Sequence, residues 1–191
     1  MKKLLIALSI LLPLSCTTGG NALKSCLSPE ELEVAQTISR EVYINIYNSV
    51  AQEGVTEKNA VIERYFDNGL RLSSVLGNMA TICPDYAYTN ILFKIFDEEV
   101  LRRFVEYDPE TCRCAIKKDG KYMDVLSRMS RRNGFLKGYY KFMQESDGCS
   151  GVPYIIAINY KNIDFNREDE QFIACLALLT RPDIEPVKFG K

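Results

Sequence analysis

The chain has 191 residues with 25 acidic and 24 basic side chains and no histidine, so its formal net charge is −1. This balance argues against a nucleic-acid-binding protein, which would carry a strong basic excess. The absence of histidine excludes Ser-His-Asp triads, Cys-His dyads and histidine-containing zinc sites. A chain of this length suits a single domain with a substantial hydrophobic core.

The first sixteen residues have the pattern of an export signal. Lys2 and Lys3 precede an apolar run over residues 4–14, and Ser15 and Cys16 follow it. The run is about half of the roughly 20 residues that a helix needs to cross a bilayer. It is therefore expected to be a signal core and not a permanent membrane span.

The segment resembles a bacterial lipoprotein precursor, through its basic start, apolar core and the sequence Leu14-Ser15-Cys16. This resemblance covers only the first twenty or so residues. It implies cleavage before Cys16, which then carries a thioether-linked diacylglycerol and an amide-linked acyl chain. Thr17, in place of Asp, implies sorting to the periplasmic side of the outer membrane of a Gram-negative cell.

Two other processing routes stay open at this point. Pro13 stands where the lipoprotein family usually has leucine, which leaves room for an ordinary signal peptidase site with Gly20 and Ala22 as its small residues. An uncleaved anchor is the third alternative. The domain boundaries expected from the lipoprotein pattern are a signal peptide over 1–15, a lipidated tether over 16–25, a globular domain over 26–182 and an extended tail over 183–191.

The first helix of the domain has the clearest start. Ser28 can cap it, Pro29 suits its first position and Glu31 can complete a capping box. Apolar residues then recur at three- and four-residue steps as far as Val50, and the helix is expected to end near Gly54.

The next segments are also predicted to be mainly helical. A second helix starts at Thr56 and is weakened or ended at Gly69, and a third covers residues 70–82. Residues 86–104 have helical spacing from about Asn90 onward, whereas their first part also fits a strand.

A small hairpin is expected near residues 111–123. Cys112, Cys114 and Ile116 alternate with more polar residues, and the sequence at 118–121 is typical of a hairpin turn.

The C-terminal part is predicted to return to helices. Short helices are expected over 123–132 and 135–145, and residues 152–160 fit a buried strand or a helix equally well. A last helix should run from a cap at Asn166 to Thr180. The predicted fold class is therefore mainly α, a single disulfide-stapled helical domain with one small hairpin.

The cysteines support export independently. Besides Cys16 the chain has six, and an even number in an oxidising compartment predicts up to three disulfides. Two of them are separated by one residue and cannot easily pair, which leaves about 12 of the 15 pairings that six cysteines allow. The predicted disulfide cysteines are Cys26, Cys83, Cys112, Cys114, Cys149 and Cys175.

Residues 113–141 hold nine basic side chains and only two acidic ones. This asymmetry favours a surface for an acidic partner protein, anionic lipid headgroups or an anionic cell-wall polymer. The competing interpretation is a solvated face whose charges pair with acids elsewhere. The predicted binding residues, called the basic patch below, are Lys117, Lys118, Lys121, Arg128, Arg131, Arg132 and Lys137.

No catalytic motif, metal site or cofactor site is predicted. We expect a membrane-anchored envelope lipoprotein that acts as a non-enzymatic binding module for a protein partner, for example an inhibitor or immunity-type protein. The alternative is a histidine-free cell-wall glycan hydrolase, which needs only two carboxyl groups. Its candidate carboxylates are Glu63, Asp67, Asp97, Glu98, Glu99 and Glu106.

Overall fold

The computed structural model describes residues 21–76, 82–84, 86–108, 110–111 and 113–181. In chain order the elements are α1 (Ala22–Cys26), α2 (Pro29–Val50), η1 (Ala51–Glu53), α3 (Lys58–Leu76), α4 (Tyr86–Phe93), α5 (Glu98–Leu101), β1 (Val105–Asp108), β2 (Arg113–Ile116), α6 (Lys121–Met129), α7 (Gly134–Glu145), α8 (Val152–Ile158), η3 (Tyr160–Asn162) and α9 (Glu168–Leu178). The mainly helical class with one small antiparallel hairpin is confirmed. Among the described residues, no helix combines the length and apolar character needed to cross a membrane.

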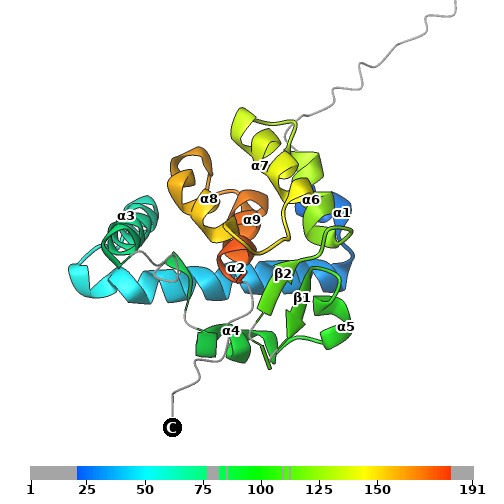
Figure 1. Cartoon of the computed structure of the whole chain (residues 1–191), viewed down its shortest axis with the longest axis horizontal. Helices are drawn as coiled ribbons and strands as arrows, with labels where there is room; N and C mark the ends of the chain where they lie inside the picture. Colours follow the sequence, from blue (N-terminus) through cyan, green and yellow to red (C-terminus); the bar gives the residue numbers. More distant parts are fainter. Residues whose placement is uncertain (1–20, 77–81, 85, 109, 112, 182–191) are drawn as a thin grey trace, which may run out of the picture.

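The long helix α2 crosses the molecule, and the other helices pack around it (Figure 1). Its predicted start is confirmed, because the Ser28 side chain accepts a hydrogen bond from the Glu31 backbone and the Glu31 carboxylate accepts one from the Ser28 backbone. Its apolar face packs mainly on α9 and α3. The helix therefore forms the base on which the rest of the domain is built.

Helix α9 is the centre of the core, and almost all of its residues are buried. The ring of Phe172 meets Phe104 edge-on at a centroid distance of 5.7 Å and lies 5.9 Å from Tyr122. The Tyr122 hydroxyl donates to the carbonyl of Ile173 at 3.0 Å and accepts from the Tyr139 hydroxyl at 2.9 Å. Two buried hydroxyls without hydrogen bonds would destabilise the fold, and these bonds satisfy both of them. The same bonds join α6, α7 and α9.

The hairpin lies one strand earlier than predicted. β2 pairs with the preceding β1, with Val105 opposite Ile116, and residues 118–121 lead into α6 instead of forming the turn. The Ile116 N–H also donates to the carbonyl of Gly148 at 2.8 Å. Gly148 has φ +81°, and a Cβ there would run into the Ile116 carbonyl, so only glycine fits this approach.

Several helix boundaries differ from those predicted. α3 continues through Gly69 as one helix, since a single glycine costs only about 1 kcal/mol and the apolar face resumes beyond it at Leu70. α4 already begins at Tyr86 and a turn separates it from α5. Residues 152–158 form a helix, which resolves the open alternative, and α9 begins at Glu168 after Arg167 and not at Asn166.

The predicted tether over 16–25 ends earlier than expected, because α1 begins at Ala22. Ala22 and Leu23 are fully buried in α1, which Asn21 caps by accepting from the Leu23 N–H at 3.0 Å. Burial in the core fixes these residues, which composition alone had assigned to a polar linker. The predicted signal peptide, Cys16 and the tail over 183–191 lie outside the described residues.

The predicted disulfides are not formed in the structure. The five described cysteines, Cys26, Cys83, Cys114, Cys149 and Cys175, are all thiols, and Cys112 lies outside the described residues. Their side chains nevertheless lie mostly in the interior, where Cys114, Cys149 and Cys175 are buried.

Candidate functional site

An open groove of about 620 Å³ lies between the N-terminal half of α2 and the segment from Ile95 to Arg103. The side chains that line it from α2 are Glu30, Glu33, Val34 and Thr37. On the facing side the lining residues are Ile95, Phe96, Asp97, Glu99, Val100 and Arg103. We call this feature the α2–α5 groove.

Local bonding fixes the far wall of the α2–α5 groove. Asp97 caps α5, since its carboxylate accepts from the backbone N–H groups of Glu99 at 2.8 Å and Val100 at 3.2 Å. The Arg103 guanidinium donates to both Glu31 and Glu99 at 3.2 Å. The wall is therefore attached to the capped start of α2 and does not depend on a ligand for its position.

The electrostatics of Glu31 explain how firmly this attachment holds. Burial by itself raises the pKa of Glu31, but the hydrogen bonds from the Ser28 backbone and the Arg103 guanidinium, with the charge of Lys121, hold the pKa below its usual value. Glu31 therefore stays ionised at neutral pH and keeps the single guanidinium of the groove engaged.

The α2–α5 groove combines an apolar floor with an acidic rim. Val34 is buried at its base, whereas the Ile95 side chain is 61% exposed, and Ile91, one turn earlier in the chain, is 66% exposed. Four carboxylates line the groove against one guanidinium that already has partners. Such a surface suits an apolar segment flanked by cationic side chains.

The predicted basic patch is only partly available as a surface. Arg132 is withdrawn from it, because its side chain is 16% exposed and its guanidinium lies 2.8 Å from the buried carboxylate of Asp169. Lys118 donates to the carbonyl of Gln144 at the end of α7, and Lys121 pairs with Asp124 at 3.7 Å. Arg132 thus has a structural role in place of the predicted binding role.

The remaining patch residues separate into two regions. Lys117 lies beside the hairpin, 3.9 Å from Asp119. Arg128, Arg131 and Lys137 are exposed around the turn between α6 and α7, and they form no ion pair with any residue of the described ranges. This second region and the exposed Lys118 present the positive charge of the patch that pairs with no carboxylate of the described ranges.

The carboxylates predicted for a hydrolase have structural partners. Glu63 and Asp67 do share a face of α3, and both accept from the Tyr160 hydroxyl, at 3.5 and 3.3 Å, beside a hollow of about 420 Å³. Glu63 is also 3.4 Å from the Lys161 ammonium, and its side chain is 56% exposed. A general acid needs a desolvated carboxyl, and this environment does not supply one.

The other three predicted acids on the α5 segment are used locally. Asp97 caps α5, Glu98 pairs with Arg102, and Glu99 pairs with Arg103. Glu106 lies exposed on β1 beside a smaller hollow next to the hairpin.

Three of the described thiols are not suited to nucleophilic chemistry. Burial raises the pKa of Cys83 to about 11 and the pKa values of Cys114 and Cys175 to about 12, so almost none of these groups is thiolate at neutral pH. Within the described ranges no three cysteine, aspartate or glutamate side chains are grouped closely enough to hold a metal ion.

Comparison with protein-family models, with curated proteins and with solved structures gave no match. The assignment of a function therefore depends on the residues and geometry of this chain.

No pattern in the sequence pointed to the α2–α5 groove. Ile91 and Ile95 were predicted to belong to one helical pattern, whereas the structure ends α4 at Phe93 and exposes both isoleucines. The acidic run Asp97-Glu98-Glu99, which follows Ile95 and Phe96, was the one signal that could have indicated a surface.

Proposed function

We propose that this chain is an envelope lipoprotein, anchored through acylated Cys16, that acts as a non-enzymatic binding module. Its partner presents an apolar segment with flanking lysine or arginine side chains to the α2–α5 groove. The observation that carries the proposal is an apolar lining of Val34, Ile95, Phe96 and Val100, with Ile95 61% exposed, beside four carboxylates. A groove that combines an apolar lining with charged residues in this way suits a segment of a protein partner.

The packing of α1 supports processing at Cys16 over processing after Ala22. The Ala22 N–H donates to the buried Asp169 carboxylate at 2.9 Å, and the Asn21 side chain donates to Glu168 at 2.8 Å. Cleavage after Ala22 would remove both bonds and leave a charged amine on Leu23, whose side chain is fully buried. Cleavage before Cys16 keeps all of these contacts.

The partner is expected to form a covalent adduct with a photoreactive residue placed at position 95, on irradiation of intact cells. The same residue at position 158, a similarly exposed isoleucine on α8, serves as the control. A distinct adduct at position 95 that is absent at position 158 identifies the partner for purification.

With the purified partner, Ile95→Ser should weaken binding at least about tenfold, because burial of one isoleucine side chain contributes roughly 1.5–3 kcal/mol. Glu33→Lys should also weaken binding at least about tenfold, because it places a positive charge against the cationic side chains of the partner. Ile158→Ser and Glu145→Lys should leave the dissociation constant unchanged, since both residues are exposed elsewhere. Equal affinities for all four variants, measured by calorimetry, would refute the assignment of the groove.

We also propose that Cys114 and Cys149 form a disulfide in the exported protein. The Ile116–Gly148 hydrogen bond places the loop containing Cys149 beside β2, which contains Cys114. Both thiols are buried. They lie on elements that are hydrogen-bonded to each other, and this supports the pairing.

The hydrolase alternative has one observation in its favour, the Glu63–Asp67 pair joined by the Tyr160 hydroxyl. We expect the purified mature chain to give no clearing in a peptidoglycan zymogram, because Glu63 is exposed and paired with Lys161. Clearing that is lost in Glu63→Gln and retained in the matched surface variant Glu145→Gln would support the enzyme instead.

A further inference from the structure

The point at which the described chain begins lies beside the α6–α7 turn. The Ala22 N–H and the Arg132 guanidinium both contact the same carboxylate oxygen, Asp169 Oδ2, at 2.9 and 2.8 Å. Arg131 is the next residue to Arg132, and α1 packs along α6 (Figure 1). The N-terminal segment therefore leaves the domain next to the cations that form no ion pair within the described ranges.

Four exposed cations lie on α1 and around the α6–α7 turn, and we call them the exit-face cations: Lys24, Arg128, Arg131 and Lys137. Of the acidic residues on these elements, Asp124 pairs with Lys121 and Asp169 lies buried against Arg132. Glu168 accepts from the neutral Asn21 amide and keeps its negative charge, so four cations face one uncompensated carboxylate. The exit face thus has a positive excess.

The length of chain before the exit limits how far this face can lie from an anchored lipid. Four residues lie between Cys16 and Asn21, and the five steps of chain span at most about 18 Å when fully extended. Screening at physiological salt acts over about 8 Å, and a tether this short lets the face approach the bilayer surface within that distance.

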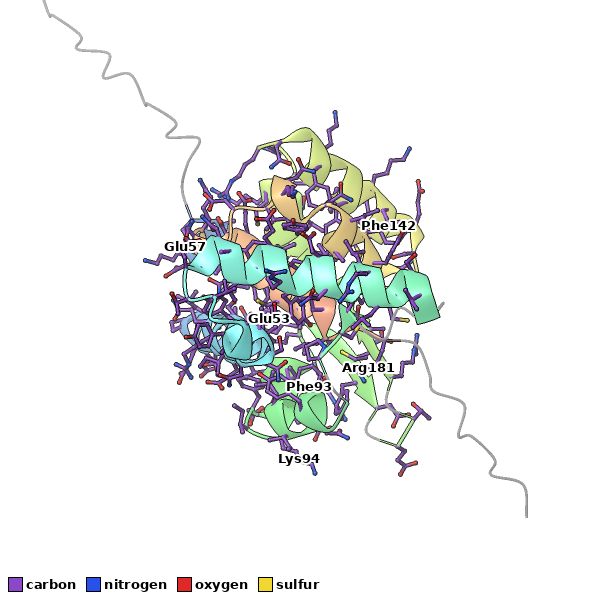
Figure 2. The ribbon with its side chains drawn as sticks, turned by 90° about the vertical axis from the view of Figure 1, so that its left-hand side faces the viewer. Glu53, Glu57, Phe93, Lys94, Phe142 and Arg181 are labelled. Carbon is purple, nitrogen blue, oxygen red and sulfur yellow. The ribbon has the colours of Figure 1, made fainter. Side chains whose placement is uncertain are left out.

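We propose that the exit-face cations bind the anionic phosphate headgroups of the membrane that holds the lipid anchor, a conclusion that rests on the proposed acylation of Cys16. This contact orients the domain so that α6 and α7 meet the bilayer. The α4 segment then points away from the membrane: Figure 2 shows Lys94 at the opposite end of the molecule from Phe142 of α7.

The test uses the chain from residue 17 to 191 without an acyl group, so that the anchor contributes nothing. It should sediment with vesicles of equal parts phosphatidylcholine and phosphatidylglycerol, but not with phosphatidylcholine alone. Arg128→Glu combined with Arg131→Glu should weaken binding about thirtyfold, since each cation near an anionic surface contributes a several-fold factor.

The matched control is Arg71→Glu combined with Lys94→Glu, which changes the net charge equally at exposed positions away from the exit face. It should bind within about twofold of the unmodified chain, and the circular dichroism melting curves should show both double variants folded. Equal binding to the two vesicle types, binding to neither, or an equal loss in the control would overturn the inference. Because no acyl group is used, these outcomes are separate from a failure of Cys16 acylation, which would overturn the proposed anchor.

Discussion

Replacing Asp169 with alanine should lower the free energy of unfolding by about 3–5 kcal/mol, because it leaves buried positive charge without its partner. Only 2% of the Asp169 side chain is exposed, and its carboxylate binds the Arg132 guanidinium at 2.8 Å and lies 3.5 Å from Arg167. It also accepts the Ala22 N–H. One side chain therefore joins α1, the end of α6 and the start of α9.

The same residue should make the stability depend on pH in acid. Burial raises the pKa of Asp169, but the hydrogen bonds from Arg132 and Ala22 and the charge of Arg167 outweigh burial and hold the pKa below its usual value. The contribution is therefore fully present above about pH 4, the unfolded value, and is lost as pH falls through the lower folded value. The alanine variant should lack this part of the acid dependence.

Urea unfolding at neutral and acid pH measures both effects. Asp124→Ala is the matched control, since Asp124 is exposed and its bond to Lys121 at 3.7 Å should contribute less than about 1 kcal/mol. If Asp169→Ala lowers the free energy of unfolding at neutral pH no more than this control does, the buried ion pair does not stabilise the fold.

A chain that starts at Leu23 should be about 3 kcal/mol less stable than one that starts at Thr17. It lacks the Asn21 cap, which contributes about 1 kcal/mol, and the bond from Ala22 to the Asp169 carboxylate, which contributes roughly 1.5–3 kcal/mol. For a domain of this size the loss corresponds to roughly 6–12 °C in melting temperature.

A third chain that starts at Asn21 provides the control, because it keeps both contacts and lacks only residues 17–20. It should melt with the Thr17 chain in differential scanning calorimetry. Equal melting of all three chains would remove the structural argument against cleavage after Ala22.

Local signals in the sequence were sufficient for the helices whose ends are capped. The capping box at Ser28 and Glu31 specified the start of α2 because both of its hydrogen bonds lie within four residues. The hairpin turn was predicted at the wrong place, because a glycine can mark either a turn or a close contact between two segments. At Gly120 a Cβ would lie 2.6 Å from the Arg103 carbonyl, so this glycine permits a close contact with a distant segment and does not mark a turn.

The site depended on long-range contacts that no local pattern reveals. Arg131 and Arg132 are adjacent arginines that no sequence pattern distinguishes. Arg132 nevertheless turns inward, because Asp169 and Glu170, far along the chain, lie beneath it. Ile95 likewise lies exposed because α4 ends at Phe93, before the helical pattern of the sequence does. The positions of the basic patch were predictable from the sequence, but their division into buried and exposed members was not.

Mass spectrometry of the intact protein from the membranes of its host tests the anchored, exported state most directly. We predict a chain that begins at Cys16, carries diacylglycerol and an amide-linked acyl chain, and has its six remaining cysteines oxidised, with Cys114 joined to Cys149 in the peptide map. An unprocessed Met1 terminus with free thiols, or an unacylated chain that begins at Leu23, would contradict the account.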